Sequence, residues 1–264
     1  MKTCKKYGNA ESLLLDLGVT DPSEINLEAI ALYCGVKVKY RELTGCEANI
    51  LGTTEKAIIT VNSQSRLERQ RFSIGHELGH WMLDRNRVGN GINCQGKDIG
   101  AQWSFRTDPE AKANAYAADL LMPRYLFGPI AKDRPMTLDS ASDVATLFTT
   151  SLTATAIRFV MLGSFPAMVV CYHQKRRKWF VRGPEVPDSF YPHEELHYET
   201  EAFGILFGNK SRKCAPTESP ADIWITKYGS EYYDVVEQTV KVSEDEVISI
   251  IWWKDEKQII DHME

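Results

Sequence analysis

The sequence has no apolar run long enough to cross a bilayer, which takes about 20 consecutive residues. Its N-terminal stretch, MKTCKKYGNAESLLLDLG, turns polar before an apolar run of the signal-peptide kind can form. Internal repeats and low-complexity blocks are also absent. We therefore expect a cytoplasmic globular protein without a membrane partner.

Regular cysteine spacing and a strong charge of one sign are missing too. The six cysteines are scattered, with no C-x-x-C pair, so a disulfide framework or a zinc ribbon is not expected and free thiols are. The net charge of -5 gives no electrostatic field that would attract nucleic acid. No direct nucleic-acid partner is therefore expected, and a protein or peptide partner is favoured.

Apolar periodicity, capping residues and β-branched alternation predict a mixed set of elements. The expected helices are 10–18, 26–35, one beginning near Arg66, 108–123, 140–148 and 151–162. The expected strands are 36–43 and 56–63, which suit a small antiparallel sheet, and a polar, glycine-rich loop is expected over 87–100. After Gly163 the pattern predicts a hairpin over 166–183 and strands over 221–229, 232–242 and 246–254, separated by loops.

The segment FSIGHELGHWML, residues 72–83, carries the clearest chemical signal. On an α-helix His76 and His80 lie only about 40° apart, so both imidazoles can bind one ion. The pattern H-E-x-x-H on a helix predicts Zn²⁺ held by the histidines, with Glu77 as general base beside the open metal position. The competing interpretation is two histidines that point at a neighbouring element or at solvent. Gly79 suggests that another backbone packs close to this helix.

A catalytic zinc needs a third protein ligand. The extended pattern H-E-x-x-H-x-x-G-x-x-H is excluded because Leu83 and Asn86 stand where it requires glycine and histidine. A glutamate from the helix 108–123 is the alternative, and Glu110 is placed for it. Asn114, one turn later, would hydrogen-bond the far nitrogen of a ligand histidine and fix its tautomer. Alanines around these residues would allow a close helix approach: Ala111, Ala113, Ala115, Ala117 and Ala118.

The same glutamate also fits a purely structural pattern. Residues 107–110 read T-x-x-E, a capping box in which Glu110 would only close the helix start. The residues alone leave the ligand and capping interpretations evenly weighted, with Asp84, Asp108 and Asp119 as weaker substitutes for the ligand.

The two motifs together, RQRFSIGHELGHWML and EAKANAYAADLLMP, resemble the ImmA/IrrE-type metallopeptidases of bacteria and phages. The family pattern is roughly R-x-x-x-A-H-E-x-G-H followed by E-x-x-A-N-x-F-A-x-x-L-L-M-P. The resemblance touches residues 20–163, with Gly75 in place of the common alanine and Tyr116 in place of phenylalanine. It implies that Glu110 is the third ligand of a zinc ion held with His76 and His80.

The resemblance also implies a function. Such proteins are zinc-dependent endopeptidases that cut, or promote the cutting of, a partner repressor of helix-turn-helix type and so release stress or mobile-element genes. The expected architecture is α+β: a zincin-like metallopeptidase domain with a small antiparallel sheet plus helices over 1–163. A β-rich C-terminal region over 164–264 would follow it, with a regulatory or substrate-docking role.

Several assignments around this mechanism stay open. The strand at 57–61 either packs in the core, which is favoured, or binds substrate by adding a peptide to its edge. Candidates for oxyanion stabilisation are Tyr116, Tyr125, Arg69 and Arg71, although such residues more often anchor a surface.

Three other patterns favour competing classes of function. A protein of the same family pattern that captures a repressor without cutting it is the alternative to a peptidase. The helices 140–148 and 151–162 outline a helix-turn-helix, but the apolar second helix, with its single Arg158, is typical of packing. The second H-E-x-x-H match, residues 193–197, is interpreted as a chance recurrence, and the basic run 175–178 as a solvated hairpin turn.

Overall fold

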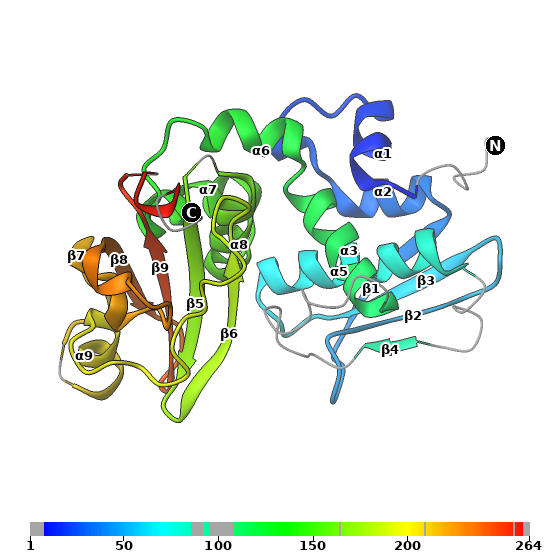
Figure 1. The fold of residues 1–264 in the computed structure, drawn as a ribbon. Helices are drawn as coiled ribbons and strands as arrows, with labels where there is room; N and C mark the ends of the chain where they lie inside the picture. Colours follow the sequence, from blue (N-terminus) through cyan, green and yellow to red (C-terminus); the bar gives the residue numbers. More distant parts are fainter. Residues whose placement is uncertain are drawn as a thin grey trace. The chain divides into compact units, whose positions relative to one another are not determined.

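A computed structural model describes residues 8–85, 92–94, 108–163, 165–208, 210–255 and 257–260. The chain packs as two compact units. The first unit consists of Met1–Pro129 and Ala145–Ser151, and the second of Ile130–Val144 and Leu152–Glu264. Figure 1 shows the elements of each unit. The predicted α+β class is confirmed, and the predicted domain boundary after residue 163 stays a prediction.

The first unit contains a four-stranded sheet in the order β1-β3-β2-β4. Its strands are β1 (Val36–Arg41), β2 (Ala48–Gly52), β3 (Ala57–Asn62) and β4 (Ile92–Cys94). β3 runs parallel to β1 and antiparallel to β2, which also pairs antiparallel with β4. The sheet is therefore mixed, and the predicted antiparallel sheet is wrong for the β1–β3 pair. The sequence pattern missed β2, which runs antiparallel to β3 and leaves the other edge of β3 to pair with β1 in parallel.

Two short helices and a 3-10 turn precede this sheet: α1 (Ala10–Asp16), η1 (Pro22–Glu24) and α2 (Leu27–Tyr33). The side chain of Asn26 accepts a hydrogen bond from the Ala29 amide, so its predicted role as N-cap is confirmed. Gly35 has a positive φ of 82°, which ends α2 without the steric penalty of a side chain.

The long helix α3 (Leu67–Leu83) lies on the sheet and contacts β2 and β3. Ile74, Leu78 and Trp81 are buried on the predicted core side, and the indole of Trp81 donates to the Cys34 carbonyl at 2.9 Å. Helix α5 (Pro109–Leu121) packs on α3, and α6 (Arg124–Ala131), which was not predicted, follows after Pro123.

The second unit contains a five-stranded antiparallel sheet in the order β6-β5-β9-β8-β7. Its strands are β5 (Ala167–His173), β6 (Arg176–Arg182), β7 (Thr217–Pro220), β8 (Asp234–Lys241) and β9 (Glu246–Trp252). The helices are α7 (Leu138–Phe148), whose last residues belong to the first unit, α8 (Leu152–Leu162), α9 (Glu201–Phe207) and α10 (Lys257–Ile260). The predicted β-rich C-terminal region is confirmed.

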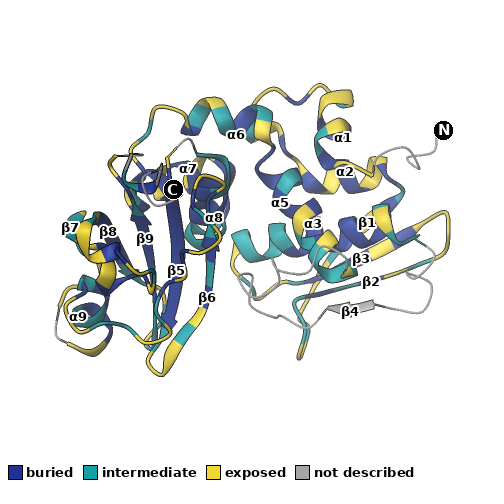
Figure 2. Cartoon of the chain, viewed as in Figure 1, coloured by how far each residue is buried: buried dark blue, intermediate teal, exposed yellow. Residues whose placement is uncertain are grey.

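Both faces of this sheet are covered, which explains its continuous apolar strands. α8 contacts β5 and β6, while α9 contacts β8 and β9. Residues 167–172 of β5 are consequently all buried, as Figure 2 shows. A strand that packs on two sides loses the alternation expected of a half-exposed strand.

The predicted strand over 221–229 is wrong. The chain there begins with the 3-10 turn η2 (Ala221–Ile223), and a second one, η3 (Ser230–Tyr232), follows it. The strand is instead β7, which lies just before 221, where one of the loops between strands was expected. Ile223, Trp224 and Ile225 are buried in the core of the second unit from an irregular backbone. Their apolar side chains give the sequence a strand-like pattern because they fill the core, although the backbone that carries them is not part of the sheet.

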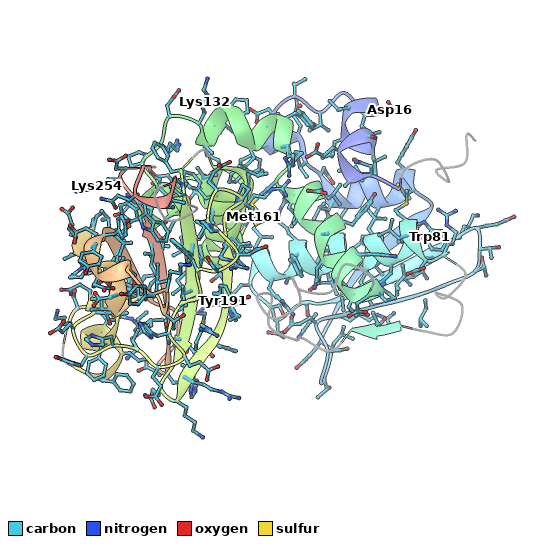
Figure 3. The ribbon with its side chains drawn as sticks, viewed as in Figure 1. Asp16, Trp81, Lys132, Met161, Tyr191 and Lys254 are labelled. Carbon is cyan, nitrogen blue, oxygen red and sulfur yellow. The ribbon has the colours of Figure 1, made fainter. Side chains whose placement is uncertain are left out.

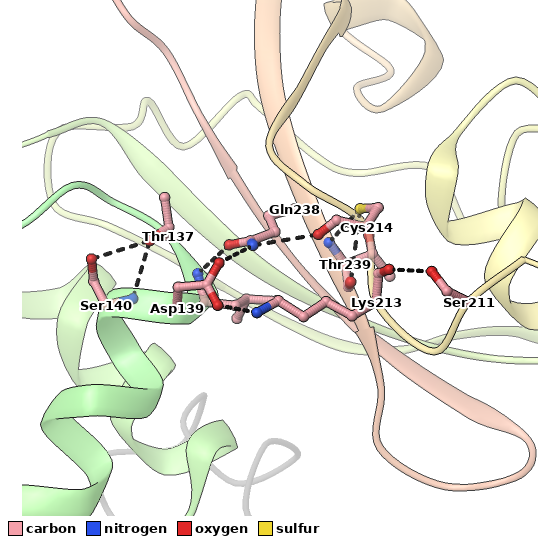
Figure 4. Close-up of polar contacts among 9 residues, drawn as sticks. Thr137, Asp139, Ser140, Ser211, Lys213, Cys214, Gln238 and Thr239 are labelled. Carbon is pink, nitrogen blue, oxygen red and sulfur yellow. Dashed lines mark hydrogen bonds and ion pairs between the residues drawn. The ribbon is translucent and has the colours of Figure 1, made fainter.

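A buried amide fixes the start of α7 on the sheet (Figure 4). Gln238 of β8 accepts a hydrogen bond from the Leu138 amide at 2.7 Å and donates to the Asp139 carboxylate at 2.7 Å. Its amide nitrogen also donates to the Cys214 carbonyl at 3.4 Å, and Lys213 pairs with Asp139. One side chain thus joins a helix, a strand and the segment before β7.

Within the part of the chain that the structure describes, no one helix combines the length and apolarity of a membrane span. Only α7 and α8 taken together pass that test, and they meet at an angle of 109°.

Candidate metal centre

The closeness of α3 and α5 depends on two glycines (Figure 1). A Cβ atom at Gly79 would lie 3.0 Å from the Cα and carbonyl oxygen of Ala113. At Gly75 it would lie 3.2 Å from the Cβ of Ala117. Small residues on both sides therefore let the two backbones approach, as the sequence predicted, and this brings the first turn of α5 beside the histidines of α3.

Three side chains from these helices converge on one point. The Nε2 atoms of His76 and His80 are 3.0 Å apart. The two carboxylate oxygens of Glu110 lie 3.3 Å from His76 Nε2 and 3.4 Å from His80 Nε2. Among the described residues these three form the group whose ligand atoms, all within 4.8 Å of one another, can hold a metal ion.

The separations test whether a metal fits. Ligands at about 2.0 to 2.1 Å from a tetrahedral zinc are roughly 3.3 Å from one another. The three distances above match that spacing. A tetrahedral ion held by three protein ligands keeps its fourth position for water or substrate, which is the arrangement of a catalytic site.

The capping interpretation of Glu110 is not supported. Helix α5 begins after Asp108, whose side chain accepts a hydrogen bond from the Glu110 amide at 3.2 Å. Glu110 is therefore the second residue of the helix, whereas a capping box needs the third. Its carboxylate turns to the histidines instead, and Thr107 lies outside the described residues.

The histidines also set the charge of this carboxylate. Hydrogen bonds from His76 and then His80 hold the pKa of Glu110 far below its ordinary value, against the opposing effect of partial burial. Glu110 is therefore ionised at neutral pH, which is the state that binds a metal.

Asn114 orients the first histidine. Its amide oxygen lies 2.8 Å from His76 Nδ1, and because this oxygen can only accept, Nδ1 carries the proton. Nε2 is then the atom that would offer its lone pair to a metal at the convergence point. The predicted contact between this amide and the far nitrogen of a ligand histidine is confirmed.

Glu77 lies between the two histidines in the chain and is fully buried. Burial of a carboxylate costs free energy unless other groups compensate for its lost hydration. Such buried groups are concentrated at functional sites. The weaker substitutes Asp84, Asp108 and Asp119 are not part of the convergent group.

Most candidates for oxyanion stabilisation have structural partners. Tyr125 donates to the Val19 carbonyl at 2.8 Å, and Arg71 donates to the Ile25 carbonyl at 3.3 Å. Arg69 lies 3.8 Å from Glu47. Tyr116 is buried in α5. These contacts favour the anchoring interpretation.

The hypothesis that the strand at 57–61 binds substrate by its edge is wrong. β3 pairs with β1 on one side and β2 on the other, so neither of its edges is open. Ile59 and Val61 are fully buried, which confirms the alternative of core packing.

The other patterns found in the sequence do not form a second site. His193 lies outside the helices and contacts the Asp222 carbonyl through Nε2 at 2.7 Å. Neither it nor His197 belongs to a metal-binding group among the residues that the structure describes. Arg158 is buried in α8, which confirms that this helix packs in the core. Of the basic run 175–178, Lys175 lies in the exposed hairpin turn, whereas residues 176–178 belong to β6, so the predicted turn is wrong for these three residues.

Comparison with known proteins defines the class. Residues 31–160 match the Peptidase_M78 family, described as the IrrE N-terminal-like domain. Residues 31–160 therefore form a domain of the ImmA/IrrE type, whose family is one of metallopeptidases, and the resemblance carried by the two motifs is confirmed.

A solved structure extends the likeness to most of the chain. A Mycobacterium tuberculosis transcriptional regulator matches with a TM-score of 0.59 and 12% identity, over 92% of this chain and 86% of that one. At this identity the match shows a shared fold. A search of curated protein sequences gives no significant match.

Proposed function

We propose that the protein is a cytoplasmic zinc-dependent endopeptidase in which His76, His80 and Glu110 hold the metal. The observation that carries this proposal is the convergence of three side chains from two helices that pack through small residues: the two Nε2 atoms lie 3.0 Å apart, and each lies 3.3 to 3.4 Å from one carboxylate oxygen of Glu110. Zn²⁺ bound there supplies a Lewis acid and a water of lowered pKa.

The protein's own residues account for the remaining steps. Glu77 takes the proton of the attacking water and passes it to the leaving amine. Asn114 keeps His76 in one tautomer and orientation throughout the cycle. Glu110 would contribute a negative charge that neutralises part of the positive charge of the metal ion. Glu77 also argues against a structural zinc site, which would have four protein ligands and no use for a base.

The proposed substrate is a partner repressor of helix-turn-helix type, whose cleavage releases stress or mobile-element genes. Family membership supports this assignment, and the fold shared with a transcriptional regulator agrees with it. The absence of a basic recognition helix in α8 agrees with a protein partner rather than direct DNA binding.

The test uses the full-length protein and the repressor encoded beside its gene. Zinc-loaded wild type should cut the repressor, whereas chelator-treated protein and Glu77→Gln should not. Glu77→Gln should still bind one equivalent of zinc, because it keeps all three ligands. If Glu77→Gln relieves repression as well as wild type, the protein captures the repressor without cutting it and the peptidase proposal is wrong.

A further inference from the structure

The side of α3 that carries the metal ligands continues toward the start of the helix. At about 100° per residue, Arg69 and Phe72 lie within about 40° of His76 around the helix axis. The ring centroids of Phe72 and His76 are 6.2 Å apart, and the guanidinium carbon of Arg69 is 5.9 Å from the Phe72 centroid. An aromatic surface therefore adjoins the candidate metal centre.

The exposure of Phe72 differs from that of the residues after it. Every side chain of α3 from Ser73 to Trp81 is buried, whereas Phe72 is partly open to solvent. Packing alone favours full burial of a phenylalanine. Apolar and aromatic side chains that border a site of polar groups are typical of binding pockets.

The position of the ring is fixed by its neighbours. The Arg69 guanidinium makes a cation–π contact with the Phe72 ring. The Nε atom of Arg69 is 3.8 Å from the Glu47 carboxylate. Glu47 in turn accepts a hydrogen bond from the Ser65 hydroxyl, just before the helix begins. A ring held in this way offers a preformed apolar surface, which lowers the entropy cost of binding.

We propose that Phe72 forms an apolar subsite that selects substrates with a bulky aliphatic or aromatic side chain close to the bond that is cut. This inference rests on the proposed endopeptidase function and adds its side-chain preference. An extended peptide advances about 3.3 Å per residue, and Phe72 lies one helical turn, about 5.4 Å, from His76. A side chain one or two residues from the bound carbonyl therefore reaches the ring.

Cleavage of matched peptides tests the preference. The probes are internally quenched peptides, selected from a library by wild-type cleavage, that differ only in Leu or Ala within two residues of the cut. Wild type should favour the Leu peptide at one of these positions by about 10-fold or more in kcat/KM, as loss of apolar contacts predicts. Phe72→Ala should reduce the ratio below about 3-fold, and Phe72→Leu should retain it.

Leu67→Ala is the matched control. Leu67 is nine residues before His76, which places it on the opposite side of α3, and it is 58% exposed. This variant should keep the wild-type preference. Zinc content should be the same for all variants, and circular dichroism should show each of them folded under the assay conditions, so that a change in preference is not caused by a damaged metal site.

Binding separates this inference from the proposed function. In a Glu77→Gln background, fluorescence anisotropy should show that Phe72→Ala weakens binding of the Leu peptide about 10-fold and leaves the Ala peptide unchanged. If zinc-loaded wild type cuts none of the library peptides and not the repressor, the proposed function fails. If wild type cuts and Phe72→Ala keeps both the cleavage ratio and the affinity, the subsite inference is overturned.

Discussion

At the residue scale, the orientation of His76 depends on a neutral amide from another helix. Asn114→Ala removes the acceptor at 2.8 Å from Nδ1, so the imidazole can rotate and its other tautomer becomes accessible. We expect zinc affinity to fall by about 10- to 100-fold. Competition with a chromophoric chelator measures this change. Asn114→Asp keeps an acceptor and should bind zinc within a few-fold of wild type; equal affinities for Asn114→Ala and wild type would contradict the positioning role.

The residue scale also shows what a local pattern can predict. The H-E-x-x-H spacing predicts that His76 and His80 share one face, because i and i+4 neighbours on a helix always do. Glu110 is different. The pattern around it fits a ligand and a helix cap equally well, and only the packing of α5 on α3 separates the two. A ligand that comes from a second helix is a non-local property, so family resemblance rather than spacing gave the assignment.

At the element scale, the distance between α3 and α5 limits the geometry of the metal centre. Gly79→Ala places a methyl group about 3.0 Å from the Ala113 backbone, which forces the helices apart. We expect a net loss of about 1 to 3 kcal/mol in the free energy of unfolding, together with weaker zinc binding. Urea denaturation and zinc titration measure the two effects.

Gly128→Ala in α6 is the control for this prediction. Apart from its chain neighbours, no atom lies within 4 Å of a Cβ built at Gly128. The gain in helix propensity is opposed there by crowding from Pro129, so the free energy of unfolding should change by less than about 1 kcal/mol. If Gly79→Ala also had so small an effect, close contact between the helices would not be the reason for the glycine.

Prediction of elements was successful where a helix has one apolar face and clear caps, as in α2, α3 and α5. It failed where tertiary packing decides the backbone. The apolar segment around Trp224 fills the core without forming a strand, and β7 is a strand although it reads as a polar loop. The parallel pairing of β1 and β3 was also missed because the intervening β2 is short and has few β-branched residues.

At the scale of the whole molecule, a buried carboxyl group makes the stability of the second unit depend on pH. Glu237 of β8 is almost fully buried and accepts a hydrogen bond from the Glu201 amide at the start of α9 at 3.2 Å. Burial raises the pKa of Glu237 to about 7, and the negative charge of Glu201 adds to this effect. The protonated form is therefore favoured in the folded state.

The sign of the pH dependence follows from proton binding. Between the ordinary carboxyl pKa of 4.5 and a pKa of about 7, the folded chain binds more protons than the unfolded one, so stability falls as pH rises through this window. From pH 5.5 to 8 we expect a loss of about 2 kcal/mol from this group. Urea unfolding of wild type and Glu237→Gln at both values checks it. The variant should lack this loss, and parallel pH profiles for the two proteins would refute the assignment.

The two units share helix α7, and this affects the design of truncated variants of the protein. The residues of α7 up to Val144 belong to the second unit, which contains the C-terminal sheet, and its last residues belong to the first unit. Helix α8 buries Ile157, Phe159 and Val160 within the second unit. A polypeptide truncated after residue 163 would carry these apolar side chains uncovered into water. We expect such a fragment to aggregate during expression, so loss of proteolysis in it would report misfolding instead of a missing regulatory signal.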